Sequence, residues 1–249
     1  MAVIESPEIL GIRPFHEFDE ANDTWPRGDR PQAIRDAAGT FRARFKEQGQ
    51  IRAVRTVDLV AAAYPTLFAF GGAAKSVNPF VSILNRLVVV QFEDFNGQLK
   101  TLAWEPTVPE GSAEAPFYEQ MLERYGQLGE KLFANYYNTV QEALALCGLT
   151  PEDVDYIAFD HLHVQDVRIL MGTDEQAGFF PNAKHLAQRK EVGTFKSIHP
   201  MQWAWYVPGG MDGIPEENLV LLDGDVELGE GLALMWTPGH TDGNMSLCV

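Results

Sequence analysis

Two apolar runs that flank the dipeptide Asn96-Gly97 constrain the fold of this chain more than any other feature. Residues 86–94 (RLVVVQFED) and 98–104 (QLKTLAW) carry the apolar side chains, and Asn-Gly tolerates the positive φ angles that a tight hairpin turn requires. From Ile51 the chain also alternates apolar and polar residues with a period of two. The sequence therefore predicts a β-hairpin over residues 86–104 and a strand that begins near residue 51.

Helical and strand patterns alternate along the rest of the chain, which is typical of an α/β fold. Helices are predicted over residues 32–48 and 116–146, and glycines near the middle of the second pattern can divide it. Thr150-Pro151 predicts a short helical turn, because threonine caps a helix and proline suits its first position. Further strands, separated by turn residues, are predicted over residues 156–159, 183–188, 219–222, 226–228, 231–237 and 245–249.

Charge and cysteine content exclude several classes of partner and compartment. The chain has 19 Lys+Arg against 35 Asp+Glu, so its net charge of −16 repels nucleic acid and anionic membranes. Two cysteines about a hundred positions apart make no disulfide framework, and the first residues lack the pattern of a signal peptide. The longest apolar stretch, residues 59–74, contains Pro65 and Gly71-Gly72 and is too short to span a bilayer. We therefore expect a cytoplasmic protein that acts on a small molecule, and the oligomeric state stays open.

Three histidines carry the strongest chemical signal in the sequence. His161 and His163 follow the predicted buried strand 156–159, and in an extended segment side chains two residues apart share one face. His240 follows another predicted strand in the turn Pro238-Gly239-His240, where the glycine allows a sharp bend. Three imidazoles and a water are the ligands of an open, catalytic zinc site. The spacing therefore predicts that His161, His163 and His240 bind a metal ion.

The segments DHLHVQD, FPNAKHLAQ and LLDGDVELGEGLALMWTPGHTDGN, taken in this order, resemble the metallo-β-lactamase superfamily. The resemblance covers roughly residues 51–249 and implies an α/β fold, a four-layered αββα sandwich, with residues 1–50 as an N-terminal extension whose role the sequence does not define. His161, His163 and His240 match the three histidines of the family's first metal site. The resemblance implies a cofactor of one or two zinc ions, with manganese or iron as alternatives.

The chain departs from the family pattern at two points. Where the family motif His-x-His-x-Asp-His has Asp and then His, this chain has Gln165 and Asp166 in the variant HLHVQD, which places the second metal site in doubt. Asp166 is the natural substitute, and we predict it as a metal ligand and as the catalytic base. The family also has an aspartate and a histidine beyond the Gly-His turn, so the sandwich is expected to lack its C-terminal closing elements, with residues 245–249 as an edge strand.

The resemblance implies a metal-dependent hydrolase that uses a metal-bound water on an ester, lactone, thioester or amide carbonyl. The alternatives are a mononuclear iron oxygenase-like member and a degenerate binding module on the same fold. Of the remaining candidates, Asp160, His185 and His199 are expected to have structural roles. The aromatic loop 201–206 either packs into the core or forms a wall of a substrate pocket.

Overall fold

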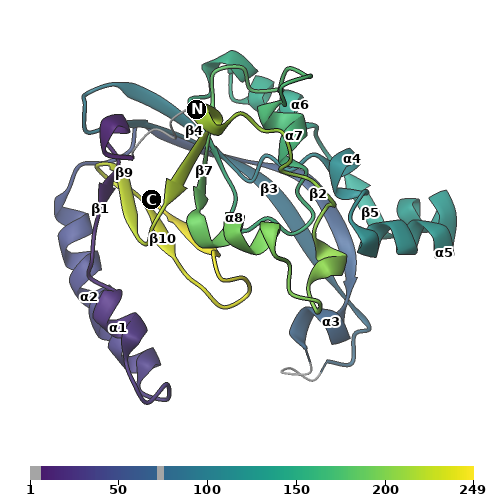
Figure 1. Cartoon of the computed structure of the whole chain (residues 1–249), viewed down its shortest axis with the longest axis horizontal. Helices are drawn as coiled ribbons and strands as arrows, with labels where there is room; N and C mark the ends of the chain where they lie inside the picture. Colours follow the sequence, from purple (N-terminus) through teal and green to yellow (C-terminus); the bar gives the residue numbers. More distant parts are fainter. Residues whose placement is uncertain (1–6, 72–75) are drawn as a thin grey trace.

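The computed structural model of the protein describes residues 7–71 and 76–249, which form two stacked β-sheets between layers of helices (Figure 1). The larger sheet has the strand order β5-β2-β3-β4-β6-β7-β8 and the smaller sheet the order β1-β9-β10-β11. The strands of the larger sheet are β2 (Ala53–Pro65), β3 (Phe80–Glu93), β4 (Leu99–Trp104), β5 (Ala134–Tyr136), β6 (Tyr156–Ala158), β7 (Lys184–Gln188) and β8 (Leu219–Leu222). Those of the smaller sheet are β1 (Arg13–Pro14), β9 (Val226–Gly229), β10 (Leu232–Trp236) and β11 (Met245–Cys248).

The predicted hairpin is confirmed as the antiparallel pair β3 and β4. Gly97 has a φ of 79°, and the carboxylate of Asp94 accepts the backbone N–H groups of Asn96 and Gln98, which fixes the turn. Strand β2 pairs with β3 along its whole length, from Ala53 to Pro65, whereas β4 pairs only with the second half of β3. The β2–β3 hairpin therefore extends beyond the end of β4.

Strands β4, β6, β7 and β8 run parallel, so their carboxyl ends meet at one edge of the larger sheet. Strand β6 is buried along its whole length, as expected for a central strand of a parallel sheet covered on both faces. It ends at Ala158, two residues before Asp160 and three before His161. This topology delivers the first two histidines to the edge where α/β proteins bind ligands.

Side-chain alternation along β10 explains the layering. Leu232 and Leu234 point into the core between the two sheets, and Ala233 and Met235 point to the opposite face. That opposite face packs against helices α1 (Asp19–Asp23) and α2 (Arg30–Glu47), through contacts that involve Phe15, Phe18 and Phe41. On the far side of the larger sheet, α6 (Val140–Leu146), α7 (Val167–Met171) and α8 (Arg189–Lys196) contribute to the second core.

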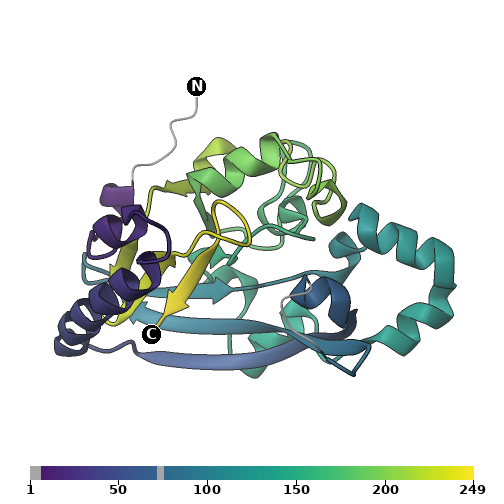
Figure 2. The ribbon, with the colours of Figure 1, turned by 90° about the horizontal axis from the view of Figure 1, so that it is seen from below.

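The N-terminal segment has a structural role that the sequence did not define. Strand β1 adds to the edge of the smaller sheet by pairing with β9, and α1 and α2 cover that sheet's outer face (Figure 2). Arg44 on α2 donates to Glu227 on β9 at 2.7 Å, which fastens the helix to the sheet. Residues 1–6 of the predicted extension lie outside the described residues, and a domain boundary near residue 50 stays a prediction. Strand β11 pairs with β10 at the other end of this sheet.

The predicted helix over residues 116–146 is wrong in its central part. Helix α5 (Pro116–Phe133) has a non-helical residue at Gly126, where φ is 60°, and it is followed by strand β5, which pairs with β2. Thr139 then caps α6, because its hydroxyl accepts the N–H of Glu142 while the Glu142 carboxylate accepts the N–H of Thr139. Helical periodicity alone does not reveal that a neighbouring strand can pair with this segment.

The shorter helices are α3 (Thr66–Phe70), α4 (Pro109–Ser112) and the 3₁₀ turns η1 (Pro7–Leu10), η2 (Pro151–Asp153), η3 (Trp203–Trp205) and η4 (Glu216–Asn218). The predicted turn after Thr150 is η2, which has a capping box between Thr150 and Asp153. Across the described ranges, none of the helices combines the length and the apolar character needed to cross a bilayer.

Candidate metal centre

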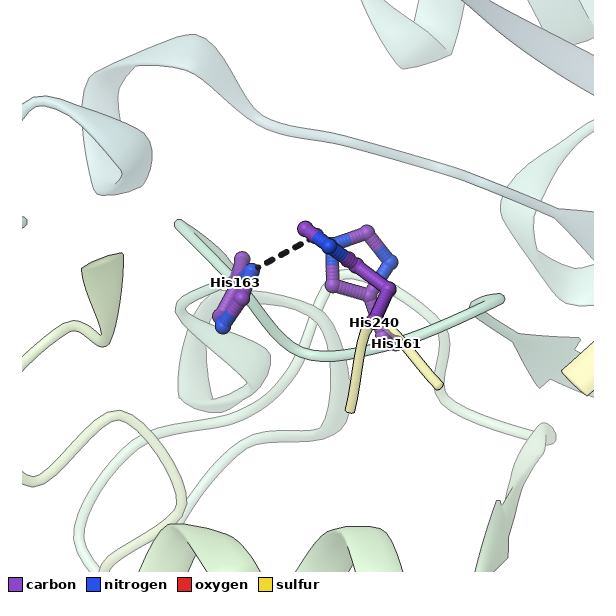
Figure 3. Close-up of side chains that lie close together, drawn as sticks. All are labelled: His161, His163 and His240. Carbon is purple, nitrogen blue, oxygen red and sulfur yellow. Dashed lines mark hydrogen bonds between the residues drawn. The ribbon is translucent and has the colours of Figure 1, made fainter. Parts of the chain in front are cut away.

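The side chains of the three predicted histidines lie close together (Figure 3). His161 and His163 follow β6 of the larger sheet, and His240 follows β10 of the smaller one. Their ring centroids are separated by 4.7 Å (His161–His163), 4.6 Å (His161–His240) and 4.8 Å (His163–His240). One nitrogen of each ring lies within 4.8 Å of the others, so the three side chains can reach a single metal ion. Their convergence agrees with the spacing in the sequence, and metal binding itself stays a prediction.

The lowered pKa values of His163 and His240 fit a metal site. His163 Nδ1 lies 3.1 Å from His240 Nε2, and His163 Nε2 is buried and has no hydrogen-bond partner among the described residues. Burial, together with the nearby rings of His161 and His240, lowers the pKa of His163 to about 3. Burial also lowers the pKa of His240. Both imidazoles are therefore neutral at physiological pH, and neutral imidazole is the form that ligates metals.

Asp160 orients the first histidine. Its Oδ1 lies 2.5 Å from His161 Nδ1 and also accepts the backbone N–H of His161, which leaves Nε2 of that ring directed elsewhere. A carboxylate bound to one ring nitrogen is the usual way in which proteins fix a ligating histidine. Burial alone would raise the pKa of Asp160, but its interactions with His161 lower it. The structural role expected for Asp160 is thus one of holding His161.

Glu105 lies behind Asp160 at the end of β4. Its carboxyl group accepts the backbone N–H of Asp160, and burial together with the charge of Asp160 raises its pKa well above the ordinary value. Glu105 also has a φ of 60° and Val164 a φ of 56°, a conformation that is costly for a residue with a side chain. Backbone strain of this kind tends to concentrate at functional sites.

The side chain of Gln165, at the position of the family's aspartate, is fixed by hydrogen bonds to other polar residues. Its Nε2 donates to the Thr107 hydroxyl at 3.0 Å, and Asn85 Nδ2 donates to the same oxygen at 3.0 Å. Thr107 and Gln165 are both buried, at 5% and 6% exposure. The amide therefore belongs to a fixed polar network beside the histidines, in which the anionic group of the family pattern is replaced by neutral ones.

Asp166 does not join the histidines, in contrast to its predicted roles as metal ligand and base. Its Oδ1 accepts Arg168 Nε at 2.8 Å and its Oδ2 accepts Arg168 Nη2 at 2.7 Å. Oδ1 also accepts the backbone N–H of Arg168 and so caps α7. The physical reason is local, because a guanidinium two residues away matches both carboxylate oxygens at once. A role as ligand or base would require the carboxylate to leave this arginine.

A cavity of about 1030 Å³ opens beside the three histidines, a volume at the upper end of the range for small-molecule sites. The overhanging β2–β3 hairpin forms one wall, and α4 and the first part of α5 form another. Most of its side chains are apolar; they include Val60, Ala62, Tyr64, Val81, Ile83, Phe117, Met121 and Trp205. A few polar groups also line it: Glu105, which contacts Asp160 next to His161, and Thr107, which contacts Gln165. This arrangement suits a ligand with a large apolar part and a polar end.

The predicted aromatic loop serves both roles that the sequence left open. Trp205 lines the cavity and packs on Phe117 with ring centroids 4.2 Å apart, while Tyr64 packs on both. The neighbouring Tyr206 is 1% exposed and lies in the core, with its ring 4.7 Å from that of His163. Core packing and pocket lining thus fall to adjacent residues.

His185 and His199 lie away from the cluster, as expected. His185 is fully buried in β7 and packs edge-on against Phe159, and burial lowers its pKa to about 4. His199 accepts the backbone N–H of Met201 in a surface loop. The sequence did not single out Thr107, Glu105 or Glu191. Each lies just past the carboxyl end of a parallel strand, and that position was the one available signal.

No protein-family model matches the sequence. The curated relatives include the N-acyl homoserine lactonase AiiA of Bacillus thuringiensis subsp. kurstaki, which is 30% identical over 102 residues. The matched segment spans 41% of this chain and 35% of that protein, so it covers about a third of the relative's length.

Two solved structures share the fold. An N-acyl homoserine lactone hydrolase with the product N-hexanoyl-L-homoserine at its catalytic metal centre has a TM-score of 0.55 and 18% identity, over 80% of this chain and 70% of its own. The dizinc quorum-quenching lactonase AidC has a TM-score of 0.53 and 12% identity, over 81% and 69%. The predicted α/β sandwich is confirmed by these likenesses and by the layers described above. The chain therefore has the fold of the metallo-β-lactamase superfamily, with a histidine cluster at the position where this resemblance implies a metal site.

Proposed function

We propose that the protein is a metal-dependent hydrolase of lactones or esters. The observation that carries the proposal is the convergence of His161, His163 and His240 beside a large and mostly apolar cavity, with the pKa values of His163 and His240 lowered by burial. Relatives that match part of the chain are N-acyl homoserine lactonases, and a neighbour in fold holds a lactone-hydrolysis product at its metal centre. These likenesses support lactones and esters ahead of the other carbonyl substrates that the sequence leaves open.

The three imidazoles would hold the metal, and Asp160 would keep the His161 ring in place. Nitrogen ligands favour zinc over magnesium or calcium, and we propose zinc, with manganese or iron as the alternatives. When bound, such an ion supplies Lewis-acid chemistry and makes a water nucleophilic at neutral pH. The fixed amide of Gln165 and the carboxyl of Glu105 line the same cavity as the histidines, and they would orient the polar part of the substrate.

The walls of the cavity support an uncharged apolar group as the other part of the substrate. Val60, Ala62 and Tyr64 on β2 lie opposite Asn85, Ile83 and Val81 on β3, so one face of the overhanging hairpin is almost entirely apolar. Burial of an acyl chain on such a face contributes about 0.8 kcal/mol per methylene group. A small molecule with an acyl chain therefore fits the site better than a charged one.

The proposal is tested by elemental analysis followed by hydrolysis assays on the same preparation. The substrates are N-hexanoyl and N-decanoyl homoserine lactone and the 4-nitrophenyl esters of acetate and decanoate, compared between the wild type and His163→Ala. Zinc in the wild type, with turnover that His163→Ala loses, supports the proposal. One iron without hydrolysis would favour an oxygenase-like member, and a protein without metal would favour a binding module.

A further inference from the structure

The carboxylate of Glu191 joins the two loops that carry the three histidines. Glu191 lies in the first turn of α8 and is 2% exposed. Its Oε1 accepts, at 2.9 Å, the backbone N–H of Leu162, the residue between His161 and His163. Its Oε2 accepts, at 2.5 Å, the hydroxyl of Thr241, the residue that follows His240. One buried side chain thus contacts both loops, although they follow strands of different sheets.

Two further contacts connect Glu191 with neighbouring segments. The Tyr206 hydroxyl donates to Glu191 Oε1 at 3.3 Å, and the Tyr206 ring packs edge-on against His163. Gly243 lies directly on the backbone of Glu191, because a Cβ at this position would be 2.2 Å from the Glu191 nitrogen. Only glycine permits so close an approach, so the loop that carries His240 is seated on the start of α8.

A carboxylate is the group best suited to this position. Its two oxygens only accept hydrogen bonds and offer about four lone pairs, which matches three donors from three segments. In the part of the chain that the structure describes, no cation pairs with Glu191, so its charge is balanced by neutral donors and by the N-terminal end of α8. An amide at this position would turn an N–H group toward one of these donors.

We infer that Glu191 is a positioning residue of the metal centre, which holds the His161–His163 loop and the His240 loop at the separation that one metal ion requires. The inference rests on metal binding by the histidines, as proposed above, and does not require that the protein hydrolyses any particular substrate. Residues that orient metal ligands without touching the metal often change metal affinity by about 10- to 100-fold. Glu191 differs from the usual case because it acts through backbone and hydroxyl groups next to the ligands.

The test measures the affinity of the full chain for Zn²⁺ by competition with a chelator, in the wild type, Glu191→Ala and Glu191→Gln. We expect Glu191→Ala to weaken Zn²⁺ binding by about 10- to 100-fold. The Zn²⁺ affinity of Glu191→Gln should lie between those of the wild type and Glu191→Ala, because one accepting oxygen remains. The visible absorption of the Co²⁺-loaded protein reports ligand geometry, and we expect it to change in Glu191→Ala.

Glu227→Ala is the matched control, because Glu227 is also a buried carboxylate, at 6% exposure, but binds Arg44 and Gln48 at the smaller sheet. It should lower the thermal midpoint and leave Zn²⁺ affinity and the Co²⁺ spectrum as in the wild type. The inference is overturned if Glu191→Ala keeps wild-type affinity and spectrum, or if both variants lose affinity in proportion to their loss of stability.

Thr241→Val provides a second route if Glu191→Ala does not fold. It removes the hydrogen bond from the Thr241 hydroxyl to Glu191 and leaves the carboxylate in place. A smaller loss of Zn²⁺ affinity is therefore expected, and no loss would count against the inference. Hydrolysis is measured separately. A wild type that binds Zn²⁺ without turnover would sink the proposed reaction and leave the role of Glu191 standing, whereas a wild type that binds no metal would overturn both.

Discussion

Two regions of the molecule each contain a buried histidine with a lowered pKa, but the surroundings of the two rings differ. His163 lies at the edge between the sheets, with the rings of His161 and His240 less than 5 Å away. His185 lies in the middle of the parallel sheet, with Phe159 against its ring. Burial lowers the pKa of both, to about 3 and about 4 respectively. Burial and a lowered pKa therefore do not distinguish a candidate metal ligand from a core residue.

The surroundings make the distinction. His163 has other imidazoles within reach, a cavity in front of it and a carboxylate, Glu191, that fixes the backbone beside it. Neither ring nitrogen of His185 has a hydrogen-bond partner among the described residues, and its strand neighbours are the apolar Ile157 and Leu219. A group of converging donors predicts a site, whereas one isolated donor in an apolar core predicts a packing role.

The largest expected difference between the two histidines is their effect on Zn²⁺ binding. We expect His163→Ala to reduce Zn²⁺ affinity by more than about a hundredfold, because removal of a direct ligand costs more than removal of an outer partner. Equilibrium dialysis against a metal buffer, with elemental analysis of the protein, measures this loss.

His185→Leu is the control for that measurement. It removes an even more deeply buried imidazole, 0% exposed against 9% for His163, whose pKa is also lowered, and it should leave the Zn²⁺ content as in the wild type. Loss of metal in His185→Leu, or its retention in His163→Ala, would show that the two histidines have been assigned to the wrong roles.

The success and the failure of prediction from sequence follow from how far apart the interacting residues lie. The histidines were found because each follows a strand, at spacings that a strand end and a glycine turn make meaningful. The pairing of Asp166 with Arg168 was not predicted, because the sequence does not show that the guanidinium binds both carboxylate oxygens. Glu191 was missed because its partners Leu162 and Thr241 lie 29 and 50 positions away in the chain.

The same limit applies to the fold. The hairpin around Gly97 is a local feature, and its turn residues are sufficient to predict it. The cover of the smaller sheet is not local, because β1 pairs with β9 and Arg44 binds Glu227, 183 positions further along the chain. The helical pattern over residues 116–146 likewise hid β5, whose pairing with β2 depends on a distant strand.

The next largest expected effect is the pH dependence of stability that arises from His185. The folded state keeps His185 neutral down to about pH 4, whereas an unfolded histidine binds a proton below about pH 6.5. Between these values only the unfolded state gains the proton, so stability is complete above pH 6.5 and falls as the pH decreases toward 4. One pKa unit corresponds to about 1.4 kcal/mol, and the loss attributable to His185 is therefore about 3 kcal/mol.

Urea unfolding of the wild type and His185→Leu, at a series of pH values from 7.5 to 4, measures this contribution as the difference between the two proteins. Asp225, whose pKa burial raises to about 6, acts in the opposite direction, but it is common to both and cancels. Parallel pH dependences in the two proteins would mean that the pKa of His185 is the same in the folded and unfolded states, which contradicts the prediction.

Asp166, close to the candidate metal centre in the sequence, tests whether a neighbouring carboxylate affects stability or Zn²⁺ binding. Asp166→Ala removes the cap of α7 and leaves the partly buried Arg168 with only the longer contact to Glu114 at 3.5 Å, so the free energy of unfolding should fall by about 2 kcal/mol. Zn²⁺ affinity should not change, because the carboxylate faces the arginine and not the histidines. A large loss of Zn²⁺ with little loss of stability would restore the ligand role predicted from the sequence.

The smallest expected effect concerns His185 at neutral pH, where protonation plays no part. Its two ring nitrogens are buried without hydrogen-bond partners in the described part of the chain, and a buried polar group left unpaired costs about 1–3 kcal/mol. Leucine fills a similar volume against Phe159 and has no polar atom. His185→Leu should therefore raise the free energy of unfolding at pH 7.5 by about 1 kcal/mol, because imperfect packing offsets part of the cost of the unpaired nitrogens.

His163→Leu at the same pH is the matched comparison, because the ring that it removes is also buried and also has a nitrogen without a hydrogen-bond partner. In the presence of Zn²⁺ it should instead lower the free energy of unfolding, because a metal that binds only the folded state stabilises it. Opposite signs for the two substitutions in Zn²⁺, converging when a chelator is added, would confirm that the metal and not burial distinguishes the two histidines. A loss of stability in His185→Leu at pH 7.5 would show instead that the ring is hydrogen-bonded in solution, for instance to a buried water.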